Sequence, residues 1–335
     1  MCTDSNPVRL ARRMAALLPA ALLALAATGS MPAAAQAWPT KPIKLIVGFP
    51  PGGGIDAVAR NLQPGLQEAL GQPVIVEYKP GVGGILAATE LTRAAPDGHT
   101  ILIANLGTFV LAPHMFSKKP FEPQKDFTYI HQTSGSGFIA VVPANHPATN
   151  LSEFIAWAKA NPNKADFASS SLGAITHLNG EMLNQVAGIK MIHVPYKGSA
   201  PAVQDLLGGQ TNLLVDVPTV LLPHIQSGRL RALYVTERQR LATLPNVPTA
   251  AEAGFPKLEA YGWQGIVGPA GIPKDVVARI SNAVHQTLAR KEVREKFEAN
   301  GSSIMERGPA DFASFIDAEI VRWVPVVKAS GATLN

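Results

Sequence analysis

The sequence predicts an α/β protein in which two lobes of mainly parallel sheet are flanked by helices. Short apolar, β-branched runs alternate with segments of helical period, which is typical of parallel strands joined by covering helices. This alternation occurs in two successive sets along the chain. About 300 residues follow a predicted export signal, which is enough chain for two lobes.

Residues 1–37 have the features of a cleaved export signal. Three arginines precede the apolar run Met14–Ala27, and small residues follow as far as Ala37. The run is shorter than the roughly 20 residues that cross a membrane. We therefore expect a soluble exported protein that begins at Trp38, with an uncleaved anchor as the alternative.

The composition excludes several classes of protein. Cys2 is the single cysteine and lies within the signal, so the exported chain should carry neither a disulfide nor a lipid. Without residues 1–37 the net charge falls from +5 to +3, a small excess that suits an anionic ligand. Basic and aromatic residues do not cluster as in nucleic-acid-binding proteins. The eight histidines lack the spacing of a metal site, so we expect neither a metal nor a cofactor.

The two sets of predicted elements fall on either side of residue 140. The first set comprises Ile43–Phe49, Asp56–Leu70, Val74–Tyr78, Ile85–Ala94 and Thr100–Leu106. Pro64 should kink or split its first helix, since an interior proline costs about 3 kcal/mol. The second set comprises Leu151–Ala160, Asp166–Ser169, Thr176–Val186, Lys190–Val194, Ala200–Leu207, Asn212–Val217 and Leu230–Val235.

Two apolar segments, Phe138–Val142 and Trp263–Val267, are predicted to cross between the lobes as hinge strands. The first lobe would then be discontinuous, with residues 38–139 and 262–335 in lobe 1 and residues 140–261 in lobe 2. The tail from Asp275 is predicted to be mostly helical. Its last helix, Pro309–Lys328, begins with a proline, which the first turn of a helix accepts.

The segment Pro50–Asp56 places three consecutive glycines between a predicted strand and a predicted helix. Glycines bring bare amide groups close to a ligand, and a helix N-terminus adds unpaired N–H groups and partial positive charge. The segment is interpreted as a carboxylate cradle, or alternatively as a simple connecting turn. It lacks the Gly-Lys-Ser/Thr sequence of a nucleotide-binding loop.

Two further strand-to-helix junctions have a similar character. Lys79–Gly84 contains three glycines but not a full dinucleotide fingerprint, which argues against a nicotinamide enzyme. Ser169–His177 offers hydroxyls and amides to a second polar group of the ligand, unless its serines only cap the helix. His177 is a conceivable general base, although a structural role is more common for a single helical histidine.

The roles of two other residues stay open in the sequence. Asp216 ends a predicted strand, where it would accept a ligand hydroxyl or ammonium, or else brace a loop. Lys197 either adds positive charge near the cleft or lies solvated on the surface. The motifs of serine hydrolases and zinc proteases are absent from the sequence, so we do not expect an enzyme.

Taken together, these segments resemble the Bug family of periplasmic solute receptors, which serve tripartite tricarboxylate transporters. The resemblance covers nearly all of the chain after residue 37 and rests on the order of WPTKPIKLIVGFPPGGGIDAVAR, LGQPVIVEYKPGVGG, APDGHTIL, FASSSLGAITHL, VPYKGSAPAVQDLLGGQ, LLPHIQSGRLRAL and YGWQGIVGPAGIP. It implies a type II periplasmic-binding-protein fold whose two lobes close on a carboxylated metabolite.

The resemblance also implies which residues contact the ligand. In the first lobe these are Phe49, Gly53, Gly54, Ile55 and Asp56, with Gly83, Gly84 and Thr108 beside them. In the second lobe they are Ser170, Gly173, Ala174, Tyr196 and Asp216. Ser171 stands where relatives commonly have glycine, Ala174 where they often have serine or threonine, and Ile55 where they often have a small or hydroxylated residue.

The function that the resemblance implies is capture of a small carboxylate for the membrane subunits of a tripartite tricarboxylate transporter. The carboxylate would be a dicarboxylate, a tricarboxylate, an acidic amino acid or an aromatic acid. A receptor that presents its ligand to a sensor kinase is one alternative. A secreted α/β hydrolase that uses His177 or Asp216 is the other.

Overall fold

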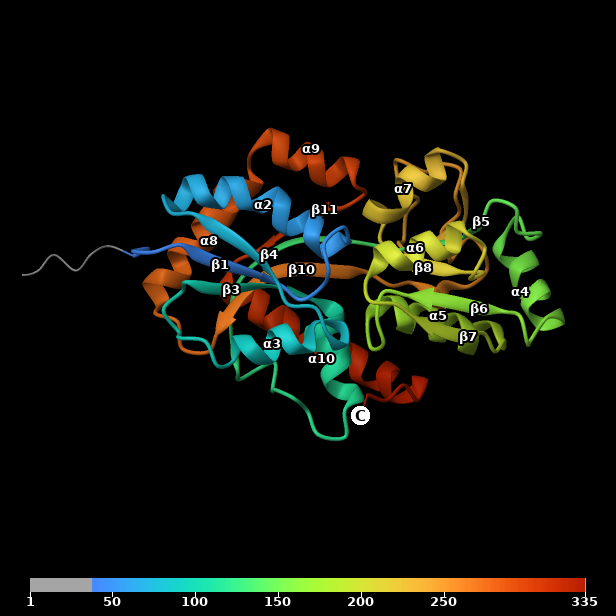
Figure 1. The fold of residues 1–335 in the computed structure, drawn as a ribbon, viewed down its shortest axis with the longest axis horizontal. Helices are drawn as coiled ribbons and strands as arrows, with labels where there is room; N and C mark the ends of the chain where they lie inside the picture. The colour runs from blue at the N-terminus through green and yellow to red at the C-terminus, as the bar shows by residue number, and fades with distance from the viewer. Residues whose placement is uncertain (1–37, 335) are drawn as a thin grey trace, which may run out of the picture. The chain divides into compact units, whose positions relative to one another are not determined.

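The computed structural model describes residues 38–334, and the predicted signal at residues 1–37 lies outside the described residues. From Lys41 onward the chain forms one compact unit that contains two β-sheets (Figure 1). Within residues 38–334, no helix combines the length and the apolar character that a membrane span requires.

The first sheet has six strands in the order β11-β4-β10-β3-β1-β2. Strand β1 pairs in parallel with β2 and β3, whereas β10 runs antiparallel to β3 and β4, and β11 runs antiparallel to β4. The strands are β1 (Ile43–Val47), β2 (Val74–Tyr78), β3 (Thr100–Asn105), β4 (Phe127–Ser136), β10 (Gly262–Pro269) and β11 (Ser303–Arg307).

Helices cover both faces of the first sheet. The connection from β1 to β2 carries α2 and the connection from β2 to β3 carries α3, so right-handed crossovers put these two helices on opposite faces (Figure 1). The helices and short helical turns are α2 (Gly54–Leu70), η1 (Val82–Gly84), α3 (Ile85–Leu91), η2 (Gly107–Leu111), η3 (Ala112–Met115), α8 (Lys274–Leu288), α9 (Lys291–Ala299) and α10 (Pro309–Ser330).

The second sheet has five strands in the order β7-β6-β8-β5-β9. Strand β6 pairs in parallel with β7 and β8, and β5 runs antiparallel to β8 and β9. The elements are β5 (Ile139–Pro143), α4 (Leu151–Ala160), β6 (Asp166–Ser169), α5 (Ile175–Ala187), β7 (Ile192–Pro195), α6 (Ser199–Leu207), β8 (Leu214–Asp216), α7 (Pro218–Gln226), β9 (Leu230–Val235) and η4 (Pro256–Leu258).

The chain passes between the sheets at two places. Only Gly137 and Phe138 separate β4 of the first sheet from β5 of the second, and the return lies between β9 and β10. The two predicted segments each lie next to a crossing, because Phe138–Val142 falls mostly in β5 and Trp263–Val267 falls in β10, a strand whose residues are all buried. Because β4, β5 and β10 run antiparallel to their neighbours, both sheets are mixed rather than mainly parallel.

Helix α2 continues through Pro64, so of the two predicted effects, a kink or a split, the split does not occur. Pro64 is exposed, so water can solvate the carbonyl that loses its hydrogen-bond donor. The next residue, Gly65, faces α8, where a methyl group would lie 2.4 Å from the side chain of Thr287. The proline thus lies on the solvent side of a helix whose opposite side packs closely.

An aromatic cluster holds the segment that follows β3. The rings of Phe109 and Phe127 meet edge to face at 4.8 Å, and those of Phe121 and Phe127 at 5.1 Å. Such pairs add about 0.5–1.5 kcal/mol beyond the area that they bury. This packing anchors η2, and with it the C-terminal end of β3.

Candidate ligand-binding site

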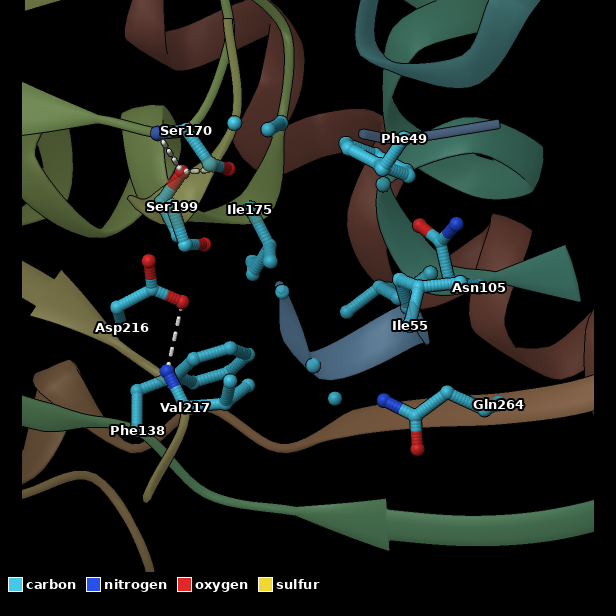
Figure 2. Close-up of a pocket in the computed structure, with 18 of the residues that line it drawn as sticks. Phe49, Ile55, Asn105, Phe138, Ser170, Ile175, Ser199, Asp216, Val217 and Gln264 are labelled. Carbon is cyan, nitrogen blue, oxygen red and sulfur yellow. Dashed lines mark hydrogen bonds between the residues drawn. The ribbon is translucent and has the colours of Figure 1, made fainter. Parts of the chain in front are cut away.

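One cavity is lined by residues that come from both sheets (Figure 2). The space inside it, including the open mouth, is about 640 Å³. The lining residues are Phe49, Pro50, Gly53, Gly54, Ile55, Asn105, Leu106, Gly107, Phe138, Ser170, Ala174, Ile175, Thr176, Gly198, Ser199, Asp216, Val217, Gly262, Trp263 and Gln264.

The cavity lies at the carboxyl ends of the parallel strands. In the first sheet β1 and β3 are neighbours whose connections run to opposite faces, and in the second sheet β6 and β8 are related in the same way. Loops separate at such switch points and leave a crevice, which is where open α/β sheets bind ligands. Residues after β1, β3, β6 and β8 all contribute to the cavity wall.

Four helices begin at the cavity. Their N-cap residues, Gly53 of α2, Ala174 of α5, Gly198 of α6 and Val217 of α7, all line it, and none forms a side-chain cap. The first turns of these helices therefore present backbone N–H groups that no cap side chain satisfies, although α7 offers fewer of them because its first residue, Pro218, has no N–H. Together with the helix dipoles, such ends favour an anion.

Two of these helix ends approach each other closely at Gly54. A methyl group on Gly54 would lie 2.7 Å from Cγ2 of Val217, which is too close for any larger residue without a shift. Its neighbour Gly53 has open space around the corresponding position. The glycine loop therefore has two functions, since Gly53 leaves room in the cavity and Gly54 allows contact between α2 and α7.

Asp216 is the only titratable side chain among the residues that line the cavity. It is 2% exposed, and its Oδ1 accepts a hydrogen bond of 2.7 Å from the N–H of Val217. Burial raises the pKa of Asp216 to about 6, although the nearby Ser199 hydroxyl and the Val217 N–H oppose the shift. Figure 2 shows the carboxylate facing Ser199.

Two side-chain amides at the cavity were not predicted from the sequence. Asn105 is fixed by Thr108, whose N–H donates to Asn105 Oδ1 at 3.0 Å. Ser134 donates to Oε1 of Gln264 at 3.0 Å, so that the Nε2 of Gln264 is directed toward the cavity in Figure 2. Both lie on strands at positions where a polar residue interrupts an apolar run, and that interruption is the signal that could have identified them.

The three serines of the Ser169–His177 junction have separate roles. Ser170 lines the cavity and its N–H donates to Thr176 Oγ1 at 3.0 Å. The hydroxyl of Ser171 accepts the N–H of Gly83 at 2.9 Å, a bond between loops of different sheets. Ser169 lies 2.6 Å from Nε2 of His193.

His177 has a structural environment rather than that of a general base. Its ring stacks on His193 with centroids 3.9 Å apart, and its Nδ1 accepts the N–H of Gly173 at 3.3 Å. The side chain is buried and does not line the cavity.

Asp56 supports the glycine loop and does not face the main cavity. Its carboxylate accepts the N–H of Gly52 at 2.8 Å, the Tyr78 hydroxyl at 2.6 Å and the Arg60 Nε at 2.9 Å. Burial alone would raise the pKa of Asp56, but these hydrogen bonds hold it below the usual value. The fully engaged carboxylate leaves no free oxygen for a ligand here.

Of the thirteen residues expected at the ligand, seven line this cavity: Phe49, Gly53, Gly54, Ile55, Ser170, Ala174 and Asp216. The others lie around it. Thr108 donates to the carbonyl of Gly83, Gly84 packs against Thr108, and Gly173 packs against Leu334. Tyr196 donates to Asp205 and, with the exposed Lys197, lines a second cavity that also includes Gly83.

The sequence matches a known family over most of its length. Residues 58–332 match the family model TctC, described as the tripartite tricarboxylate transporter family receptor. The protein BugT of Bordetella pertussis is 34% identical over 305 residues, which cover 91% of this chain and 94% of BugT. The predicted membership in the Bug family is thereby confirmed.

Solved structures confirm the fold. The periplasmic binding protein BugD has a TM-score of 0.85 at 33% identity, covering 88% of this chain and 99% of BugD. MatC from Rhodopseudomonas palustris with bound malate has a TM-score of 0.83 at 32% identity, covering 87% of this chain and 100% of MatC. The Rpa4515 protein of R. palustris with adipate has a TM-score of 0.85 at 30% identity, covering 89% of this chain and 100% of Rpa4515. The chain belongs to the TctC family of tripartite tricarboxylate transporter receptors.

Proposed function

We propose that this receptor captures a small carboxylate in the cavity described above and delivers it to the membrane subunits of a tripartite tricarboxylate transporter. The observation that carries the proposal is the convergence of four uncapped helix N-termini on one cavity. Solved relatives that hold malate and adipate support the same class of ligand.

The charges at the cavity favour recognition by backbone groups. None of its lining residues is a lysine, arginine or histidine. A carboxylate would therefore be neutralised by N–H groups and helix dipoles, each charge-assisted hydrogen bond contributing about 1.5–3 kcal/mol. The direct contacts that we propose are with Gly53, Gly54 and Ile55 at the start of α2, with Ala174 at the start of α5 and with Ser170 directly after β6.

Several of the other predicted residues would shape the walls of the cavity. Asp56 shapes the glycine loop through Gly52, and Thr108 holds the Gly83 carbonyl. In this proposal Gly83, Gly84 and Gly173 allow the loops to approach each other. Tyr196 borders the second cavity, which shares Phe49 and Ser170 with the first.

We infer that the two lobes, residues 38–139 with 262–335 and residues 140–261, close on the ligand about the segments that join the sheets. The short link through Gly137 and Phe138 and the longer return before Gly262 are the places where a hinge would act. Export directed by residues 1–37 would place the receptor in the periplasm, from which it would deliver the ligand.

A thermal-shift screen tests capture, using the ligand-stripped protein and a panel of mono-, di- and tricarboxylates, acidic amino acids and aromatic acids. An acid at a hundred times its Kd should stabilise the protein by about 2.7 kcal/mol. The bound acid, recovered and analysed by mass spectrometry, should be chemically unchanged. Absence of any shift would contradict carboxylate capture, and conversion of the acid would contradict the receptor role.

The transport step needs its own test. Cells that lack the receptor should fail to accumulate the isotopically labelled acid, and the receptor gene should restore uptake. Equal uptake with and without the receptor would contradict delivery to a transporter.

A further inference from the structure

The carboxylate of Asp216 is incompletely paired. Asp216 ends β8, directly before the start of α7, and is 2% exposed. Its Oδ1 accepts the Val217 N–H at 2.7 Å. The Ser199 hydroxyl lies near the carboxylate and acts to lower its pKa, but Oδ2 makes no hydrogen bond of normal geometry among residues 38–334. Most buried polar atoms in proteins are paired, so an unpaired carboxylate oxygen at a cavity wall needs an explanation.

Among the residues that line the cavity, no cation is present to pair with Oδ2 of Asp216. The other residues that line the cavity are apolar, hydroxylated or amide-bearing, and none of them is basic. Leaving a buried charged acceptor without a partner is costly. A ligand that brings its own donor would remove this cost on binding.

The cavity therefore has two kinds of polar group with opposite requirements. The starts of α2, α5, α6 and α7 present donors, whereas Asp216 presents an acceptor between the starts of α6 and α7. A molecule that carries only carboxylates satisfies the donors but places a negative charge near Asp216. A molecule with a carboxylate and an adjacent donor satisfies both.

We propose that Asp216 selects ligands that carry a hydrogen-bond donor, an ammonium or a hydroxyl group, on the carbon next to a carboxylate. The donor binds Oδ2 of Asp216 while the carboxylate binds the helix starts. This inference rests on the proposed capture of carboxylates and narrows it to amino acids and hydroxy acids.

Matched acids test the selection. Each set shares one carbon skeleton and differs only in the substituent: succinate, malate and aspartate; glutarate, 2-hydroxyglutarate and glutamate; propionate, lactate and alanine; phenylacetate, mandelate and phenylglycine. Calorimetric titration of the ligand-stripped protein gives Kd for each acid. In any skeleton that binds, a donor-bearing member should bind at least tenfold more tightly than the donor-free member.

The Asp216→Asn variant provides the second measurement, because the amide retains an acceptor for Val217 but has no charge. It should lose at least tenfold affinity for the preferred donor-bearing acid and little for the donor-free acid. Asp275→Asn, an exposed residue on α8, removes the same charge away from the cavity and should leave both affinities unchanged. If Asp216→Asn fails to fold, the titration of the matched acids against the wild-type protein still tests the proposal.

The outcomes separate this inference from the proposed function. If the donor-free acid binds the wild-type protein as tightly as its donor-bearing partners, selection by Asp216 is wrong while carboxylate capture stands. An unchanged preference in Asp216→Asn has the same meaning. If no carboxylate binds in any set or in the wider panel, the proposed function fails and the inference fails with it. A preference for ammonium over hydroxyl identifies amino acids as the ligand class, and the reverse identifies hydroxy acids.

Discussion

At the scale of single residues, Gly54 is the position where the smallest change should affect binding. Its added methyl group in Gly54→Ala would lie 2.7 Å from Val217 Cγ2, across the contact between α2 and α7. Overpacking of this kind destabilises by about 1–3 kcal/mol, and the destabilisation arises only when the starts of α2 and α7 are in contact. We expect Gly54→Ala to weaken carboxylate binding about tenfold in a calorimetric titration.

A second substitution distinguishes this contact from a general loss of stability. Val217→Ala removes the branched side chain, so the double variant Gly54→Ala/Val217→Ala should recover most of the affinity. Gly308→Ala is the matched control, because Gly308 is also an N-cap glycine and has open space at the position of the new methyl group. Wild-type affinity in Gly54→Ala would contradict the close approach.

The free energy of unfolding should fall as the pH is lowered, and His193 should account for part of that fall. Burial, and then the charge of His177, lower the pKa of His193 from 6.5 to about 4. The unfolded chain therefore binds the proton first as the pH falls, and stability is lost between about pH 6.5 and 4. The loss from this residue is about 2 kcal/mol at pH 5.

The measurement for His193 is urea unfolding at pH 8 and pH 5. Other histidines, among them His114, His131 and His146, also have lowered pKa values and add to the loss in the wild-type protein. His193→Gln should reduce the difference between the two pH values by about 2 kcal/mol. An equal pH dependence in the variant would show that His193 is not buried as a neutral ring.

Which residues line the cavity was only partly predictable. Gly53, Gly54 and Ser170 come after strands and Asp216 ends one, and all four line the cavity, while their contact with a ligand stays a prediction. Asp56 is indistinguishable from a ligand contact in the sequence, because its pairing with Tyr78 joins positions 22 residues apart. Gln264 was missed because it lies within a buried strand rather than at a loop.

At the scale of elements, the bond between the η1 turn and the serine loop links the two sheets. Gly83 in η1 donates its N–H to Ser171 Oγ at 2.9 Å. A neutral hydrogen bond contributes about 0.5–1.5 kcal/mol net, and this one forms only when the loops are together. Ser171→Ala should therefore weaken ligand binding about fivefold, as measured by calorimetry.

Ser227→Ala serves as the control for Ser171. The Ser227 hydroxyl donates to the carbonyl of His224, three residues away, so its loss should not affect the contact between sheets. Equal affinities for Ser171→Ala, Ser227→Ala and the wild-type protein would contradict a role for the bond in ligand capture.

Element prediction succeeded where the hydrophobic pattern was local. Strand β2 and helix α4 match their predicted bounds. Helix α7 was missed because it has a second proline, Pro223, in its interior, although Pro218 at its start is a helix signal. Strand β11 was missed because its alternation is weak and its pairing partner, β4, lies about 170 residues earlier.

At the scale of the whole molecule, ligand binding should make the protein more compact. The two sheets are joined by the short link through Gly137 and Phe138 and by the longer return before Gly262, and their loops meet at the cavity through contacts such as that of Gly83 with Ser171. Small-angle X-ray scattering should give a smaller radius of gyration with a saturating acid than without it. The same radius in both states would contradict closure by lobe motion.

The class of fold was predictable because the alternation of strands and helices repeats twice. The antiparallel pairing within each sheet was not predictable, because the strands β4, β5 and β10, which lie next to the crossings, have no local signal for direction. The convergence of four helix starts on one cavity was also beyond the sequence, since it depends on strand order in both sheets.

The central claim is that backbone N–H groups at helix starts hold the ligand carboxylate. A crystal structure of the protein with the acid that stabilises it most tests this directly. The account predicts a carboxylate oxygen within about 3.2 Å of backbone nitrogens in the first turns of α2 and of at least one of α5, α6 and α7. A carboxylate held instead by lysine or arginine side chains, or bound outside this cavity, would contradict it.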